Sequence, residues 1–377
     1  MADITLSSAV RSNLNALQAT SALMSSVQEK LATGKKVNSA LDNPNSFFTA
    51  KGLENRANDL STLLDDMGQS VQTLKAADEG ISAISDLVDA AKAKANQAQQ
   101  TSSQTERAQF ALEYNELLTQ IEDLAKDAGY KGKNLLGGTG NDLSVTFNED
   151  GTSSLSISAV DYTDTSLSTG LNLSDLATAT DGTATLTLST TATSGSTLDG
   201  NYGFTAGDTI TLTDANGTEV GSLTIDTTTT AADLEALYDG IDGVSASLAT
   251  GTLTVTSEFR LTTSSSAATP ADFTTNGTDS GFATDTAIES TLSSLKSAQD
   301  ALRAQASTFG TNLSIVENRQ DFTNALINTL EEGAGQLTLA DTNEEGANLL
   351  ALQTQQSLAS TSLSLAAQAD QNVLRLF

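Results

Sequence analysis

The side chains that most often carry out chemistry are scarce in this sequence. Its 377 residues include no histidine and no cysteine, so the commonest general base, metal ligand and thiol nucleophile are missing. Acidic residues are plentiful, and Glu149 with Asp150, or Asp208 with Asp214, are candidate Ca²⁺ ligands. Both pairs lack the spacing of a calcium-binding loop, which favours a solvated surface. We therefore expect no catalytic, cofactor-binding or metal-binding residue, and no enzymatic activity.

The charge balance excludes a further class of protein. The chain has 18 basic and 47 acidic residues, which gives a formal net charge of −29. Binding to nucleic acid depends on clustered Lys and Arg, so we expect no nucleic-acid partner. The opening MADITLSSAVRSNLNAL has no basic segment followed by an apolar run, and no stretch approaches 18 apolar residues. We expect no membrane insertion, and any export must proceed without a cleaved signal peptide.

The elements that make up the chain differ in composition. Residues 1 to about 137 and about 286 to 377 are rich in Ala, Leu, Gln and Asn, whereas the middle is rich in Thr, Ser, Gly and Asp. Arg260 is the only basic residue of that middle region. The composition therefore predicts a distinct domain inserted between two related flanks, with most of the negative charge on its solvated surface.

The inner parts of both flanks carry apolar residues at alternating spacings of three and four. This spacing predicts long helices that pack along a coiled-coil seam, although an ordinary helical bundle core shows the same pattern. Gln299 and Gln320 also fall on the seam, where a polar residue costs stability and can fix the register. The predicted rod residues are Leu53, Leu60, Leu64, Met67, Val71, Leu74, Ile81, Val88, Ile288, Leu292, Leu295, Leu302, Phe309, Leu313, Val316, Ile327 and Leu330.

The two extremities repeat this pattern more thinly. A buried Leu contributes about 1.5 to 3 kcal/mol, whereas fixing one residue's backbone costs about 1 to 2 kcal/mol. With fewer than two large apolar residues per heptad, these ends need neighbours, either each other or other copies of the chain. The predicted inner-core residues are Val10, Leu14, Leu17, Met24, Leu31, Leu349, Leu352, Leu363, Val373 and Phe377.

Several local signals predict where helices start. Ser103 with Glu106, Thr286 with Glu289, and Thr342 with Glu345 have the spacing of a capping box. Thr230 is expected to cap a short helix over AADLEALYDGI in the middle region. A break at QQTSSQT separates two helices of the first flank.

The middle region alternates apolar residues with Thr or Ser. This pattern predicts half-buried antiparallel strands separated by Gly and Asp turns. With the helix behind Thr230, it predicts a β hairpin, a short helix and a second hairpin. The predicted strand segments are LSVTF, SLSIS, ATLTLST, DTITLTD, GSLTIDT and GTLTVTS.

Four segments together resemble bacterial flagellins. They are SSAVRSNLNALQAT at 7–20, LATGKKVNSALDN at 31–43, GYKGKNLLGG at 129–138, and the ending from ADTNEEGANLL to NVLRLF. Their order along both flanks is more specific than any single motif. Asn43 and Pro44 depart from the commoner pair of an acidic residue and alanine, which we interpret as variation within the family.

The resemblance implies a mainly α fold with a β insertion. The chain ends would form long antiparallel coiled-coil helices, and the Thr/Ser-rich β domain would lie outermost. The interhelix turn comprises Gly34, Lys35, Lys36, Asn43 and Pro44, and Asn43 caps the helix that Pro44 begins. The implied parts are an inner-core helix and turn at 1–42, rod helices at 43–138, a surface-exposed β-rich domain at 139–285, a rod helix at 286–340 and an inner-core helix at 341–377.

The resemblance also implies a function and partners. The chain would polymerise into the extracellular bacterial flagellar filament, and so serve swimming motility as a structural subunit. Its implied partners are further copies of itself, the flagellar export apparatus, an export chaperone, the cap and junction proteins, and other flagellins. The alternatives are a hook-filament junction protein, which shares the end helices, and a filament-borne adhesin acting through the central domain. An enzyme with paired carboxylates ranks third.

Overall fold

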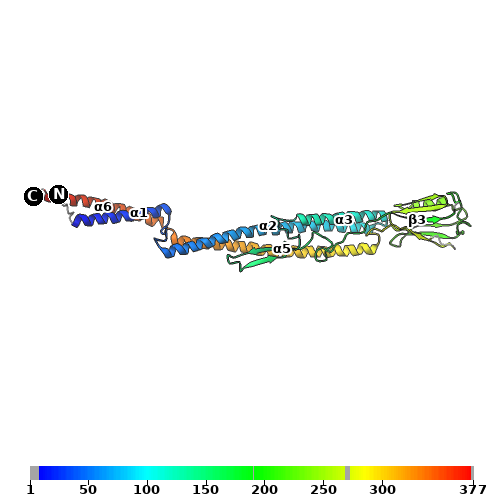
Figure 1. The fold of residues 1–377 in the computed structure, drawn as a ribbon, viewed down its shortest axis with the longest axis horizontal. Helices are drawn as coiled ribbons and strands as arrows, with labels where there is room; N and C mark the ends of the chain where they lie inside the picture. Colours follow the sequence, from blue (N-terminus) through cyan, green and yellow to red (C-terminus); the bar gives the residue numbers. More distant parts are fainter. Residues whose placement is uncertain (1–7, 190, 268–271, 375–377) are drawn as a thin grey trace. The chain divides into compact units, whose positions relative to one another are not determined.

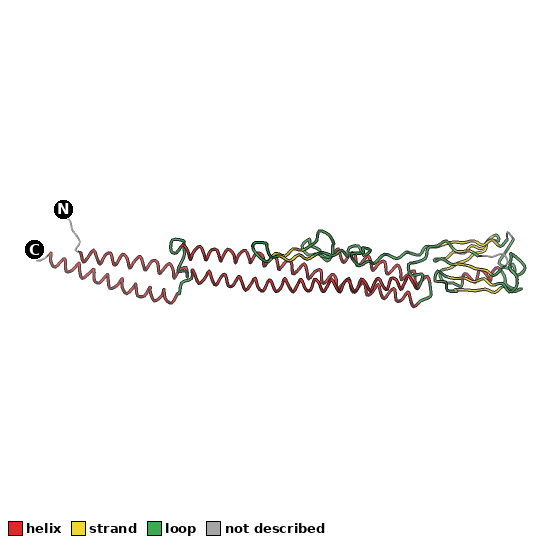
Figure 2. Tube along the Cα trace, turned by 90° about the horizontal axis from the view of Figure 1, so that it is seen from below, coloured by secondary structure: helices red, strands yellow, loops and turns green. Residues whose placement is uncertain are grey.

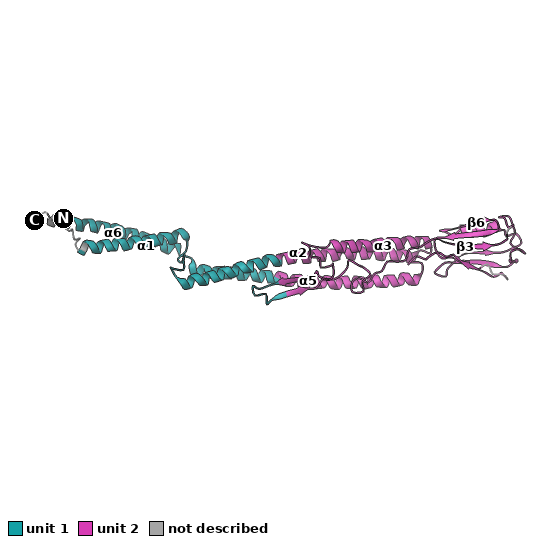
Figure 3. Cartoon of the chain, viewed as in Figure 1, with its two compact units in different colours: residues 1–67, 146–154, 318–377 teal, residues 68–145, 155–317 magenta. Residues whose placement is uncertain are grey.

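A computed structural model of the chain describes residues 8–189, 191–267 and 272–374. The chain divides into two compact units, coloured separately in Figure 3. Unit 1 comprises residues 1–67, 146–154 and 318–377, and unit 2 comprises residues 68–145 and 155–317. The two longest helices each contribute residues to both units.

The chain is mainly α-helical with a β-rich insertion, as the sequence predicts (Figure 1). The helices are α1 (Ser8–Thr33), α2 (Pro44–Gln100), α3 (Gln104–Asp127), α4 (Ala231–Asp239), α5 (Asp285–Thr338) and α6 (Thr342–Leu374). The strands are β1 (Leu143–Thr146), β2 (Ser154–Ile157), β3 (Gly182–Thr187), β4 (Thr209–Thr213), β5 (Glu219–Thr224), β6 (Val244–Ala249), β7 (Thr252–Ser257), β8 (Thr262–Ser265) and β9 (Phe273–Thr274). At 57 and 54 residues, α2 and α5 have the length that the extended seam predicts.

Unit 1 contains an antiparallel pair formed by α1 and α6, which lie side by side in Figures 1 and 3. Lys30 near the end of α1 contacts Glu345 near the start of α6. Asn13 near the start of α1 contacts Ser362 farther along α6. The opposite order of these contacts along the two helices fixes their antiparallel direction.

The helical part of unit 2 is built from α2, α3 and α5, which run side by side (Figures 1 and 2). Many of its completely buried residues are alanines, whose small side chains let the helix backbones approach closely. Gly80 of α2 is needed for the same reason, because a Cβ atom there would lie 2.7 Å from the Cβ of Ala128. The alanines with no exposed surface are Ala77, Ala91, Ala95, Ala98, Ala111 and Ala125.

The strands form three antiparallel sheets. β1 pairs with β2, β7 lies between β3 and β6, and the remaining four strands follow the order β5-β4-β8-β9. Leu253 of β7 faces Leu186 of β3 on one side and Leu248 of β6 on the other. The predicted first hairpin and helix are confirmed as β4–β5 and α4, and the second hairpin pairs the predicted strand β7 with β6, which was not among the predicted segments. The strands β6, β8 and β9 were not predicted.

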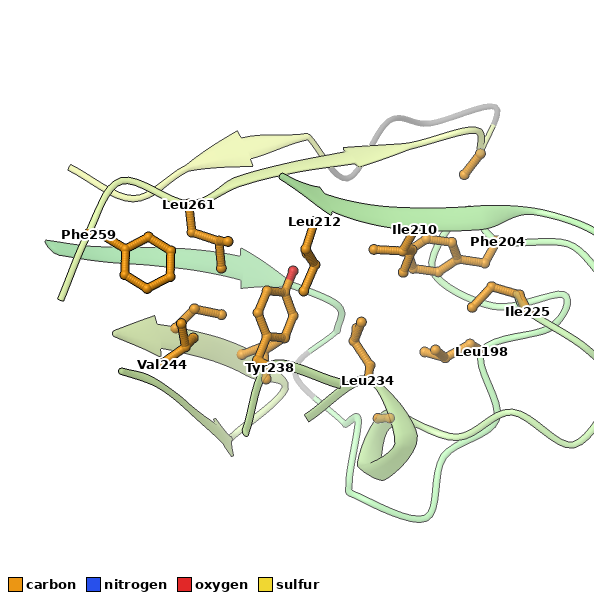
Figure 4. Packing of buried hydrophobic residues seen from close by; sticks show 14 residues of the cluster. Leu198, Phe204, Ile210, Leu212, Ile225, Leu234, Tyr238, Val244, Phe259 and Leu261 are labelled. Carbon is orange, nitrogen blue, oxygen red and sulfur yellow. The ribbon is translucent and has the colours of Figure 1, made fainter. Parts of the chain in front are cut away.

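The core of the β-rich part gathers side chains from both larger sheets and from α4 (Figure 4). Thr and Ser alternate with these apolar residues along the strands, so one face of each strand packs inward. Leu234 and Tyr238 of α4 join Leu212 of β4, and each of the three has no exposed surface. Aliphatic residues therefore build most of this core, as the low aromatic content of 4% requires.

Tyr238 gives this core a dependence on alkaline pH. Its hydroxyl lies 2.9 Å from the Thr263 Oγ1 atom, and burial raises the pKa of Tyr238 to about 12. An unfolded tyrosine ionises near pH 10, so the raised pKa means that the neutral side chain stabilises the folded core. This contribution to the free energy of unfolding is fully present below about pH 10 and is lost as the pH rises toward 12. We expect the free energy of unfolding of the β-rich part to fall across this range. Urea titrations at each pH check it, and Tyr238→Phe should make the fall shallower.

The helix starts test the predicted caps. Thr230 caps α4 in a full capping box with Asp233, as expected, and Asn43 Oδ1 accepts from the Ser46 N–H at the start of α2. Ser103 caps α3, but Glu106 accepts from the Thr101 hydroxyl, so only half of that box forms.

The other two predicted boxes are wrong. Thr284, two residues before Thr286, accepts from the Ala287 N–H at the start of α5. Asp341 caps α6 by accepting from the Asn343 and Glu344 N–H groups, and it replaces Thr342 in that role. At both helices a side-chain oxygen one or two positions before the predicted cap accepts the first free N–H groups instead.

Candidate assembly site

The residues predicted for the inner core are distributed over α1 and α6. Val10 is 8% exposed, whereas Leu14 is 37% exposed. Val27 was not predicted, yet it is the most deeply buried described residue of α1 at 7%. The half-buried members of the predicted set are Leu17, Met24, Leu31, Leu349, Leu352 and Leu363. Phe377 lies outside the described residues, as does the side chain of Val373.

The polar contacts between α1 and α6 in the described residues include one part-buried ion pair and one exposed hydrogen bond. The Lys30 Nζ atom lies 3.2 Å from Glu345 Oε1, and Asn13 Nδ2 donates to Ser362 Oγ at 3.3 Å. An exposed contact such as the one between Asn13 and Ser362 contributes about 0 to 1 kcal/mol. The α1–α6 pair therefore depends on its thin apolar seam.

Other leucines of this pair face solvent. Leu350, Leu358 and Leu365 of α6 are 66%, 66% and 63% exposed, and their spacings of eight and seven place them on one face of the helix. On α1, Leu23 is 57% exposed. A row of exposed leucines therefore lies beside the thinly packed seam.

The turn between α1 and α2 is held to the turn between α5 and α6. Gly34 has a φ of +67°, a conformation that glycine adopts without strain. Its carbonyl accepts from the Ala340 N–H at 3.0 Å, while the Lys36 N–H donates to the Thr338 carbonyl at 2.7 Å. The Lys36 side chain also donates to the Gln336 carbonyl. The two connections thus form a short antiparallel ladder.

The residues predicted for the rod are all buried or half-buried. In unit 1, Ala57, Leu60 and Leu330 form a small cluster that Leu53 and Ile327 cover. The buried members of the predicted set are Leu60, Met67, Val71, Leu74, Ile81, Val88, Ile288, Leu295, Leu302, Phe309, Val316 and Leu330. The half-buried members are Leu53, Leu64, Leu292, Leu313 and Ile327.

A polar residue is buried within the rod, as the heptad pattern predicts. Gln299 is 5% exposed and donates to the Asp89 carboxylate. It also accepts from the Lys92 Nζ atom at 3.4 Å. Because both partners lie on α2, these contacts link α5 to α2 at one register. Gln320 is half-buried.

A second polar cluster joins the helices of unit 2 to its β-rich part. Arg107 of α3 is 4% exposed and donates to the Thr101 carbonyl, the Ala283 carbonyl and the Asp285 carboxylate. Gln104 donates to Asp214 Oδ2 at 2.9 Å, at the tip of the β4–β5 hairpin. The hydrogen bond from Arg107 holds the pKa of Asp285 below its usual value.

Arg107→Ala is expected to lower the free energy of unfolding by about 1.5 to 3 kcal/mol, because the charged hydrogen bond to Asp285 is lost. The buried Ala283 carbonyl also loses a donor. Urea denaturation of the full chain measures the effect. Arg107→Lys, which keeps the charge but not the planar fork, should fall between the wild type and the alanine variant.

The acidic pairs considered as calcium ligands serve local structure. Asp208 accepts from the Thr205 N–H at 2.7 Å, and Asp214 accepts from the Asn216 and Thr218 N–H groups. Glu149 pairs with Arg56. In the described part of the chain, no group of three or more His, Cys, Asp or Glu side chains is placed to hold a metal ion. None of the described helices is both long and apolar enough to span a membrane.

Comparisons with known proteins agree with this arrangement of helices. Residues 5–141 match the family model of the bacterial flagellin N-terminal helical region, and residues 292–377 match that of the C-terminal helical region. Flagellin A of Rhizobium meliloti is 26% identical over 419 residues, covering 100% of both chains. The flagellin of Brucella melitensis biotype 1 is 25% identical over 381 residues, covering 100% of this chain and 99% of its own.

Among solved structures, FlgL of Xanthomonas campestris superposes with a TM-score of 0.33 at 18% identity, over 72% of this chain and 98% of its own. The flagellar junction protein FlgL of Legionella pneumophila also gives a TM-score of 0.33, at 15% identity, over 77% of this chain and 100% of its own. The two family models together cover more than half of the chain, and the matches to the flagellins of Rhizobium meliloti and Brucella melitensis named above span all of it. The chain belongs to the bacterial flagellin family.

Proposed function

We propose that this chain polymerises into the bacterial flagellar filament and acts there as a structural subunit, without enzymatic activity. The observation that carries the proposal is the α1–α6 pair, which combines a thin seam with leucines that are 57 to 66% exposed. Such a surface is stabilised when further copies cover it. In the filament, the extremities at 1–42 and 341–377 form the inner core, 43–138 and 286–340 form the rod, and 139–285 faces outward.

This function sets the location and partners of the chain. The subunit acts outside the cell, on the flagellum, and reaches it through the flagellar export apparatus. An export chaperone, the cap protein, the junction proteins and other flagellins complete the set of partners. The absence of cysteine and the presence of only two prolines support export in an unfolded form, because disulfide reshuffling and proline isomerisation would slow refolding.

Electron microscopy of the purified full chain after seeding with short filament fragments tests this proposal. We expect long filaments that grow from the seeds as protein is added. Growth that stops after one layer would contradict the proposal and favour the hook-filament junction protein. Deleting residues 140–284 provides a second comparison. Filament assembly should persist in this deletion under either reading. Loss of binding to a host or glycan target would identify the chain as an adhesin.

A further inference from the structure

The side chain of Gln104, at the start of α3, is buried but only partly hydrogen-bonded. Gln104 is 5% exposed, and its Nε2 atom donates to Asp214 Oδ2 at 2.9 Å and to the Ala283 carbonyl at 3.1 Å. Exchanging the amide oxygen and nitrogen would turn an acceptor toward these two acceptors, so the amide has one favourable orientation. In this orientation the Oε1 atom has no hydrogen-bond partner among the described residues. A buried acceptor of this kind indicates a bound group that carries a donor.

Gln104 lines a hollow of unit 2, between the start of α3 and the end of α4. The volume of the hollow is about 230 Å³. Its exposed lining residues, Ser102, Gly240 and Asp242, form the rim. Its buried lining residues, Gln104 and Phe259, form the floor. The unpartnered oxygen therefore belongs to the deep end of a hollow whose rim faces solvent.

The groups around the rim are mainly acceptors of hydrogen bonds. Asp242 Oδ2 accepts from the Ser103 hydroxyl at 3.1 Å, and this is the one hydrogen bond that the carboxylate makes with the described residues. A second carboxylate, Glu258, lies close by and accepts from the Thr105 hydroxyl at 3.2 Å. Gly240 is the C-cap of α4, so the negative end of that helix dipole also lies at the hollow.

The positive charges of the surrounding elements are already paired. Arg107 of α3 pairs with Asp285 at 2.6 Å, and Arg260 pairs with Asp279 at 3.2 Å. The start of α3 carries a positive dipole equivalent to about half an elementary charge, which the full charge of Asp242 outweighs. The hollow therefore favours a cation over an anion.

A primary ammonium group fits this lining better than a metal ion. Ca²⁺ takes six to eight oxygen ligands, several of them carboxylates, whereas Asp242 is the one carboxylate among the described lining residues. A primary ammonium carries three N–H donors, which suit the Asp242 carboxylate and Gln104 Oε1. The apolar lining residues are Val220, Ile241 and Phe259, which can contact an alkyl chain and, through the aromatic ring, the cation itself.

We propose that this hollow binds a primary ammonium group on a short alkyl chain. Gln104 Oε1 and the Asp242 carboxylate accept its hydrogen bonds, and Val220 and Ile241 contact the alkyl chain. The lining residues all belong to unit 2, so binding requires no filament. The failure of this site and the failure of polymerisation are therefore separate outcomes.

Calorimetric titration of the unpolymerised full chain with n-butylammonium chloride tests the proposal. We expect a dissociation constant on the order of 1 mM, as is usual for a small ligand with few contacts. Butyltrimethylammonium keeps the charge and the butyl chain but has no N–H donor, so it should bind at least about tenfold more weakly. Equal binding of the two cations, or no binding of either, would overturn the proposal.

Asp242→Asn tests the location of the site. Asparagine can still accept from the Ser103 hydroxyl, so the fold is retained while the charge is lost. We expect butylammonium to bind at least about tenfold more weakly. Glu235→Gln removes the same charge from α4 at a residue that does not line the hollow, and it should leave the affinity nearly unchanged. Wild-type affinity in Asp242→Asn would contradict the assignment.

Ser102→Lys places the ammonium group on the protein itself. Ser102 lies at the rim, so a lysine there can reach into the hollow. We expect the urea midpoint of this variant to exceed that of Ser102→Met, which has an apolar side chain without the ammonium. Ser102→Lys should also no longer bind butylammonium, whereas Gln109→Lys, with the same charge at an exposed residue of α3, should bind it normally. Wild-type binding by Ser102→Lys would place the site elsewhere.

Titration of seeded filaments distinguishes two sources of the ammonium group. If filaments bind butylammonium as the unpolymerised chain does, the hollow takes a free amine. If filaments lose this binding and regain it on depolymerisation, a lysine side chain of a neighbouring copy occupies the hollow. A chain that forms no filaments but binds butylammonium would overturn the proposed function and leave this site standing.

Discussion

Replacing Val27 by aspartate is expected to abolish filament growth while the β-rich part stays folded. Val27 is 7% exposed in the α1–α6 pair, whose apolar seam is thin. An uncompensated buried charge costs about 3 to 5 kcal/mol, which we expect to exceed the free energy that holds α1 and α6 together. Electron microscopy and sedimentation after seeding measure growth, and the urea transition of the β-rich part reports on its fold.

Ser26→Asp is the matched control for this substitution. Ser26 is the preceding residue of α1 and is exposed, so the same charge there stays in water. We expect this variant to grow filaments at close to the wild-type rate. Normal filaments from Val27→Asp would show that the seam between α1 and α6 is not needed for assembly.

Leu212→Ala is expected to destabilise the β-rich part and to leave filament growth intact. Leu212 has no exposed surface and packs in the core between the two larger sheets. Removing its side chain should lower the free energy of unfolding of the β-rich part by about 2 to 5 kcal/mol. Filament growth should persist, because the buried seams of α1, α2, α5 and α6 keep all of their side chains.

Thr211→Ala is the control for Leu212→Ala. Thr211 is the neighbouring residue of β4 and lies on the other face of the strand, where it is half-buried. Its substitution should change the free energy of unfolding by less than about 1 kcal/mol. Equal effects from the two variants would mean that the inward face of β4 does not carry the stability of this part.

The sequence predicts the helices better than it predicts how they start. The repeat of apolar residues extends over many turns, so each residue adds to one signal, and α2, α3 and α5 follow it. A cap depends on a single oxygen. At α6, Glu345 was expected to complete a box with Thr342, but it pairs with Lys30, which is distant in sequence. Such a contact exists only after α1 and α6 have come together.

The strands show a similar division. β4 and β7 alternate Ile, Leu or Val with Thr, and their period of two is clear in the sequence. β8 consists only of Thr and Ser, yet it lies between β4 and β9. Its place depends on backbone hydrogen bonds to β4, which leave no trace in the pattern of apolar residues. The local periodicity of the sequence does not predict which strands pair with each other, nor which distant residues come into contact.

The sequence predicts the candidate assembly site only as stripes of apolar residues along each helix. Val27 was missed because the predicted stripe passes through Met24 and Leu31 and places Gln28, not Val27, between them.

The ladder between the two connections has a mechanical consequence. Gly34 and Lys36 are hydrogen-bonded to Ala340 and Thr338, so neither strand of the joint can bend or stretch alone. A pull on α1 is passed to α6 at the same level, and a twist at one connection must be matched by the other. A displacement of either connection therefore strains the hydrogen bonds that hold it to the other.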